Sequence, residues 1–145
     1  MFRQNFRIHR MTEERELDLA GEIVGLAMKV HRVLGPGFLE SVYEKAVAVE
    51  LERSRFVFER QKPLRVFYED AVAGEFTADL VVEGSLIVEL KAASAIVPAH
   101  EVQLVNYLTA TGVEDGLLLN FGAASLEFKR KYRTYRTPKA RELVL

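Results

Sequence analysis

Three ionisable residues, Asp79, Glu89 and Lys91, stand inside segments that are otherwise apolar, "FTADLVV" and "LIVELKA". Two carboxylates held side by side repel each other, and burial raises the pKa of a carboxyl unless a positive charge compensates. Lys91 offers one such charge. A hard divalent cation offers two, because Mg²⁺ and Mn²⁺ prefer oxygen ligands. Such a metal activates water and stabilises charge on a phosphate, so the three residues predict a cation site for phosphate chemistry.

A structural ion pair at the end of a strand is the alternative interpretation of the same residues. The spacing, Asp followed by Glu ten positions later and Lys two further on, is short and finds many chance matches. The three residues alone leave both interpretations open.

Two strands joined by a turn at 83–85 must position these side chains. One register keeps a whole face apolar: Val82 pairs with Leu86, Val81 with Ile87, Leu80 with Val88, Asp79 with Glu89 and Ala78 with Leu90. A shift by one residue would mix the polar and apolar faces. Glu89 and Lys91 leave the same face because strand side chains alternate. The pattern therefore gathers Asp79, Glu89 and Lys91 at one end of that face.

Helices and further strands are expected around this hairpin. Apolar periodicity and the breaks at 35–37 and Gly112 predict helices over 13–34, 39–53 and 98–111. Strands are expected over 56–60, 64–69, 74–82, 86–92, 116–122 and 125–132. Strand, helix and strand in succession predict a crossover with parallel pairing, and the strand-rich middle predicts antiparallel pairing. The fold class is therefore α/β (or α+β), with a mixed β-sheet flanked by helices.

Length and composition predict one domain with a buried core. The chain has 145 residues, 49% of them hydrophobic, and a net charge of −1. It has no cysteine, which excludes disulfides and thiolate metal sites and is compatible with the cytoplasm, where we expect the protein. No apolar run approaches the ~18 residues of a membrane span, so no membrane partner is expected.

The ends of the chain are expected to lie outside the domain. We expect an N-terminal extension at 1–12, a domain at 13–131 and a basic C-terminal tail at 132–145. Met11 opens a typical helix start, so it is an alternative to Met1 as the native first residue.

Basic residues gather near the C-terminal end, with tyrosines between them. They are Lys129, Arg130, Lys131, Arg133, Arg136, Lys139 and Arg141, with Tyr132 and Tyr135 interleaved. Such a segment can follow a phosphate backbone while its aromatic rings stack on bases. A solvated, partly frayed tail is the alternative. Lys129, Lys131 and Arg133 are the candidates for substrate binding.

The hairpin and its surroundings resemble the core of the PD-(D/E)XK nuclease superfamily. Within that superfamily, Gly37, Glu40 and Tyr43 match the signature of the GxxExxY proteins. The similarity continues through "VHRVLGPG", "GEFTADLVVE", "VELKA", "HEVQLVNYL" and "GLLLNFG", over residues 18–130. The resemblance implies a restriction-endonuclease-like PD-(D/E)XK core.

The resemblance implies a role for each matching residue. Asp79 and Glu89 become ligands of Mg²⁺ or Mn²⁺, and Lys91 becomes the catalytic lysine of phosphodiester hydrolysis. Glu40 becomes a third catalytic carboxylate that binds the metal directly or through a water. Ala78 stands where the superfamily's name has proline, at a position that is loosely kept.

Gln103 and Tyr107 resemble the QxxxY motif of the RecB-like branch. Their i, i+4 spacing puts both on one helix face, where they would contact substrate or support the metal site. A polar stripe with one aromatic ring packed on the core is the alternative. The resemblance favours the functional role.

His31, Tyr43, Glu44 and His100 are weaker candidates. RecB-like nucleases can recruit a helix histidine as a metal ligand, but a lone His at the end of an apolar helix is more often a hydrogen-bonded packing residue. Glu44 lies one turn after Glu40 on the same face. We favour a solvated surface position for Glu44.

The sequence therefore predicts a Mg²⁺- or Mn²⁺-dependent nuclease that acts on DNA, with RNA as the less favoured substrate. A non-catalytic module that binds nucleic acid or a partner on a nuclease-like fold is one alternative. A metal-dependent phosphohydrolase of small nucleotides is another. A chain of this size would reach both strands of a duplex as a homodimer.

Overall fold

The structure, a computed structural model, describes residues 19–133. The extension expected at 1–12 lies outside the described residues. So does the expected tail, apart from Tyr132 and Arg133.

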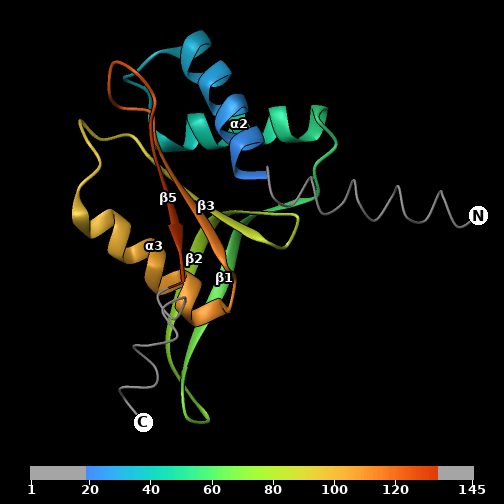
Figure 1. Cartoon of the computed structure of the whole chain (residues 1–145), viewed down its shortest axis with the longest axis vertical. Coiled ribbons are helices and arrows are strands. Elements are labelled where there is room, and N and C mark those ends of the chain that lie inside the picture. Colours follow the sequence, from blue (N-terminus) through green and yellow to red (C-terminus); the bar gives the residue numbers. More distant parts are fainter. Residues whose placement is uncertain (1–18, 134–145) are drawn as a thin grey trace, which may run out of the picture.

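Three helices and one mixed sheet make up the described part (Figure 1). The first helix covers 19–34, α2 covers Glu40–Arg53 and α3 covers Pro98–Thr111. The sheet contains β1 (Phe58–Tyr68), β2 (Ala71–Val82), β3 (Leu86–Lys91), β4 (Asp115–Asn120) and β5 (Glu127–Tyr132), in that spatial order. Neighbouring strands are antiparallel except β3 and β4, which are parallel and linked through α3. The predicted mixed sheet flanked by helices is confirmed.

Apolar side chains cover both faces of the sheet. The 19–34 helix and α2 pack on one face, where Ile23, Tyr43 and Leu51 are fully buried. On the other face, α3 contributes Leu104 and Leu108 to a second cluster. Full burial of one large apolar side chain stabilises the fold by roughly 1.5–3 kcal/mol. The two clusters together therefore hold the sheet between two helical layers. No helix among residues 19–133 is long and apolar enough to cross a membrane.

One continuous strand replaces the two that we expect at 56–60 and 64–69. β1 runs from Phe58 to Tyr68, so the expected break at 61–63 is wrong. Pro63 fits because β1 is an edge strand, where a missing backbone N–H can face outward. Gln61 adapts in another way: its φ is +48°, at the step opposite Asp79 where β1 and β2 skip a pair.

The expected register of the β2–β3 hairpin is confirmed near the turn. Leu80 pairs with Val88, Val81 with Ile87 and Val82 with Leu86. The ladder stops there, so the expected pairs of Asp79 with Glu89 and Ala78 with Leu90 are wrong. Ala78 packs in the α3-side cluster whereas Leu80 packs on the α2 side. The alternation of β2 is therefore interrupted at Asp79.

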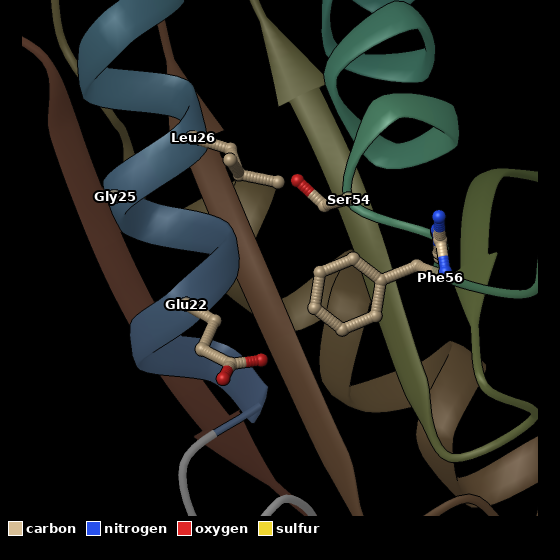
Figure 2. Close-up of a pocket in the computed structure, with 6 residues that line it drawn as sticks. Glu22, Gly25, Leu26, Ser54 and Phe56 are labelled. Atoms are coloured by element: carbon tan, nitrogen blue, oxygen red, sulfur yellow. The ribbon is translucent and has the colours of Figure 1, made fainter.

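A cavity of about 600 Å³ lies between the first helix and the turn after α2. Figure 2 shows Glu22, Gly25 and Leu26 on the helix side, facing Ser54 and Phe56. A Cβ added at Gly25 would meet no atom within 4 Å.

Gly122 is a position where only glycine fits. A Cβ there would overlap the backbone of Ala93, two residues after Lys91. Gly122→Ala is therefore expected to destabilise the protein by about 1–3 kcal/mol in urea unfolding, because the backbone beside Lys91 must shift.

The matched control is Gly25→Ala, which adds the same methyl group on a helix with open space around it. It is expected to stabilise by roughly 0.5–1 kcal/mol, since alanine is the better helix former. Equal effects of the two substitutions would contradict the close approach at Gly122.

Candidate active site

Asp79 and Glu89 lie where β2 and β3 separate, and each binds the other strand's backbone. Oδ2 of Asp79 accepts a hydrogen bond from the N–H of Leu90 at 2.8 Å. Oε1 of Glu89 accepts one from the N–H of Asp79 at 3.1 Å. These bonds take the place of the next rungs of the ladder, so the strands part without leaving either N–H group unpaired.

Burial makes the Glu89 carboxyl unusually basic. Glu89 is only 4% exposed. Its burial, and secondly the charge of Asp79, raise the pKa of Glu89 to about 8, against the opposing hydrogen bond from the Asp79 N–H and the charge of Lys91. In the metal-free protein Glu89 therefore carries a proton at neutral pH. Ionisation of Glu89 therefore calls for positive charge beyond that of the Lys91 ammonium group.

Lys91 is held by α3. Its Nζ donates a hydrogen bond to the amide oxygen of Gln103 at 3.3 Å. Tyr107, one turn further on, hydrogen-bonds with Gln103. Burial, followed by the charges of Glu89 and Asp79, raises the pKa of Tyr107. The structure thus places both residues of the expected QxxxY pair beside Lys91 and the carboxylates.

Glu40 reaches the site from the first turn of α2. A cavity of about 290 Å³ is lined by Glu40, Ser41, Glu44, Gln61, Asp79 and Leu90. Partial burial raises the pKa of Glu40, with the charge of Lys91 as the main opposing influence. Glu40 and Asp79 therefore line the same cavity, between the start of α2 and strands β1, β2 and β3.

Glu44 is not the solvated surface residue that we expect from the sequence. It is 8% exposed and accepts hydrogen bonds from Arg60, at 3.0 Å, and from the amide of Gln61. The same Gln61 amide lies 3.3 Å from Oδ1 of Asp79, to which it donates. The edge strand β1 buries Glu44 by covering that face of α2, which helix periodicity alone does not reveal.

Gln61 is a site residue that sequence reasoning misses. It stands in "ERQKP", a polar segment next to a proline, which is typical of a loop. Its left-handed backbone, with φ of +48°, turns the side chain toward Glu44 and Asp79. Gln61 could be found from its position opposite Asp79. That position is known only when the pairing of the whole of β1 with β2 is known.

The spacing of Gly37, Glu40 and Tyr43 has a structural basis. Gly37 has φ of +113°, which favours glycine. The Tyr43 hydroxyl donates to the carbonyl of Gly35 at 2.5 Å and accepts from the N–H of Phe38 at 3.2 Å. Its ring stacks on Phe121 with centroids 4.6 Å apart. Tyr43 thereby fixes the loop that starts α2 at Glu40.

The two candidate histidines lie in different places. His31 is buried, with Nε2 2.9 Å from the carbonyl of Ala123, and it lines a cavity that shares no residue with the Glu40 cavity. His100 accepts the N–H of Val97 through Nδ1 at 3.2 Å, at the start of α3. The charge of His100 also acts on Glu40, so His100 lies on the site's side of the molecule.

Three basic candidates lie in β5 or directly after it. Lys129 and Lys131 are two residues apart in the strand, so alternation puts them on one face, and Arg133 follows the end of the strand. Lys131 pairs with Glu101 of α3 at 2.7 Å, and Arg133 pairs with Glu114. Lys129 is exposed and lies opposite Leu118, which in turn lies opposite Glu89. Arg130 of β5 lies over the ring of Tyr132, 5.5 Å from its centroid. Arg136, Lys139, Arg141 and Tyr135 lie outside the described residues.

The donor set suits a hard cation, although it is small. Within residues 19–133, no three His, Cys, Asp or Glu side chains are arranged as a metal-binding group. Half-buried Asp79 and buried Glu89 nevertheless bring two carboxylates together, and Glu40 faces the adjoining cavity. Mg²⁺ and Mn²⁺ prefer oxygen ligands, so these residues fit such an ion once Glu89 has lost its proton.

Residues 17–131 match the family model of the PD-(D/E)XK nuclease superfamily, and the chain belongs to this superfamily. Among solved structures, the crystal structure of SSO0001 is similar, with 17% identity and a TM-score of 0.53. The match covers 72% of this chain and 55% of that chain, so this chain spans about half of SSO0001. This likeness supports the fold.

An alkaline exonuclease (LHK-Exo) from Laribacter hongkongensis is also similar, with 12% identity and a TM-score of 0.48. The match covers 81% of this chain and 72% of that one. A search of curated proteins gave no match.

The raised pKa of Glu89 predicts how stability depends on pH. Between its ordinary value of 4.5 and about 8, folded Glu89 keeps a proton that the unfolded chain releases. Its stabilising contribution is therefore complete below pH 4.5 and is lost as pH rises to about 8. In EDTA, the stability of the wild type should fall through this window by roughly 1 kcal/mol per pH unit more steeply than that of Glu89→Gln.

Urea unfolding at several pH values checks this expectation. Glu89→Gln is the suitable comparison because it keeps the shape of the protonated carboxyl but cannot titrate. Parallel stability curves for the two proteins would show that Glu89 titrates normally.

Proposed function

We propose that this protein is a nuclease that hydrolyses phosphodiester bonds with Mg²⁺ or Mn²⁺ and prefers DNA to RNA. The observation that carries this proposal is the geometry of two carboxylates, buried Glu89 and half-buried Asp79, which are fixed by backbone N–H groups at the point where their strands separate. Lys91 follows on the same strand, and its ammonium group is held by Gln103. Membership of a nuclease superfamily supports the reaction class.

Asp79 and Glu89 are the residues that we propose as ligands of the cation, with Glu40 as a third ligand, direct or through a water. When bound, the cation supplies a Lewis acid that activates a water and neutralises phosphate charge. The proton that Glu89 holds in the metal-free protein has to leave before its oxygens can serve as ligands.

The chain's own groups would act on the phosphate and the water. The Lys91 ammonium group stabilises negative charge that develops on the phosphoryl oxygens and orients the attacking water. Gln103 keeps Lys91 in position and, with Tyr107, contacts the substrate. Lys129, Lys131 and Arg133 would neutralise neighbouring phosphates of the strand.

We assign the chain to the GxxExxY proteins within the RecB-like branch. The residues of the first motif have distinct roles, since Gly37 allows the turn, Glu40 enters the cavity and Tyr43 fastens the loop. The Gln103–Tyr107 pair beside Lys91 supports the second assignment. The proposed location is the cytoplasm, and a homodimer is the proposed assembly if both strands of a duplex are cut.

Cleavage assays with labelled DNA and RNA in Mg²⁺ and Mn²⁺ test the proposal. EDTA should abolish cleavage. Lys91→Ala and Glu89→Ala should each lower kcat by about 10²–10³-fold, the cost of removing one group that stabilises the transition state. Lys45→Ala, at an exposed position of α2, is the control and should retain full activity. Undiminished activity of the Lys91 and Glu89 variants would rule out the assigned site.

Gln61 is expected to act as a positioning residue for Asp79. Gln61→Gly keeps the left-handed backbone without strain but removes the amide that joins Glu44 to Asp79. Mn²⁺ affinity, measured by calorimetry, should fall by about 10–100-fold, as is typical when a residue behind a metal ligand is removed. The melting temperature should change little. A lower melting temperature with unchanged Mn²⁺ affinity would show that Gln61 only stabilises the fold.

A further inference from the structure

A second pocket lies beside the candidate active site. It adjoins α3, the helix whose Gln103 contacts Lys91. It measures about 350 Å³ and is lined by Phe76 of β2 and by Ala99, Val102, Gln103, Asn106 and Tyr107 of α3. The helix residues recur at intervals of three and four, so they form one stripe along α3 that faces the strand. Gln103 belongs to both places, because its amide oxygen holds Lys91.

Exposed apolar groups form the walls of this pocket. Phe76 is 42% exposed and Val102 58% exposed. The ring of Phe76 lies 5.3 Å from that of Tyr107, at an angle of 47°, so the two rings form a tilted corner. Tyr107 is only 7% exposed and belongs to the core, so the aromatic surface that is open to a flat ligand is that of Phe76.

The polar groups of the pocket are neutral. The amides of Gln103 and Asn106 can each donate and accept hydrogen bonds, as the edge of a nucleobase requires. Among residues 19–133, no charged side chain lines the pocket. A phosphate is therefore not bound inside it, and the cation that lies beside Gln103 is Lys91.

We propose that this pocket receives one unpaired nucleobase of a single-stranded nucleic acid whose phosphate lies at Asp79, Glu89 and Lys91. The inference rests on the proposed nuclease function and specifies its substrate as single-stranded. Aromatic side chains stack on bases whose faces are free, and amides read the edges that pairing would otherwise occupy. In a duplex, both the faces and the edges are already in use. The pocket is also at the small end of the range for ligand sites, on the order of 300–1,000 Å³, which suits one base.

Binding of a fluorescent single-stranded DNA oligonucleotide to the full chain in EDTA tests the pocket without cleavage. Phe76→Leu keeps apolar volume against Tyr107 but removes the ring, and it should weaken binding by between about 5-fold and 150-fold, the usual effect of losing one base–aromatic stack. Phe67→Leu is the matched control, since Phe67 is 60% exposed on the same β1–β2 hairpin and does not line the pocket. It should bind like the wild type.

A scan with single abasic sites identifies the base itself. One abasic position should reduce binding to the wild type, and that reduction should disappear in Phe76→Leu, because the ring and the base are then both absent. Equal binding of the matched duplex, or an abasic scan without a sensitive position, would overturn the proposal. Competition by thymidine monophosphate at concentrations that match the oligonucleotide would assign the pocket to free nucleotides instead.

The outcome for the proposed nuclease function is separate. If no nucleic acid is cleaved in Mg²⁺ or Mn²⁺ but the abasic scan shows the Phe76-dependent position, the pocket stands and the nuclease function fails. If the wild type cleaves single strands and duplexes at equal rates, the nuclease function stands and the base pocket fails.

Discussion

The site depends on the hydrogen bonds of Asp79 and Glu89. Their carboxylates accept backbone N–H groups where a regular ladder would use backbone carbonyls. If the ladder of backbone hydrogen bonds continued, β2 and β3 would stay paired at this point. The side chains of Asp79 and Glu89 would then project from the faces of the sheet. Here each carboxylate accepts the N–H group that the missing ladder would have used. The strands can therefore part with their hydrogen bonds satisfied, and the opening between them becomes the place where two carboxylates meet.

Electrostatics then determine what this opening can bind. The Glu89 carboxyl is buried beside the charge of Asp79, so its ionisation is costly, and its raised pKa expresses that cost. The chain provides one nearby ammonium group, Lys91, and directs it toward Gln103 as well. Once Glu89 ionises, the site therefore holds more negative charge than Lys91 compensates.

The two helical layers bring further groups to the same end of the sheet. Tyr43 closes the loop before α2 so that Glu40 begins the helix at the cavity, and α3 starts close enough for His100 to influence Glu40. From α3 come Gln103, beside Lys91, and Tyr107, whose ring also meets Phe76. One helix therefore links the carboxylates to the neighbouring apolar pocket, because Gln103 contacts Lys91 and also lines that pocket.

The sequence by itself determined the mixed sheet, the bounds of α2 and α3 to within a residue, and the register of β2 and β3 near the turn. Alternation of apolar residues and the glycine breaks contain that information locally. Only the tertiary structure decided that the ladder stops at Asp79, that β1 is continuous, and that Glu44 is buried beneath Arg60 and Gln61. Those features depend on which strand covers which helix and on competition between side chains and backbone for the same N–H groups, contacts between residues ten or more positions apart that no local pattern encodes.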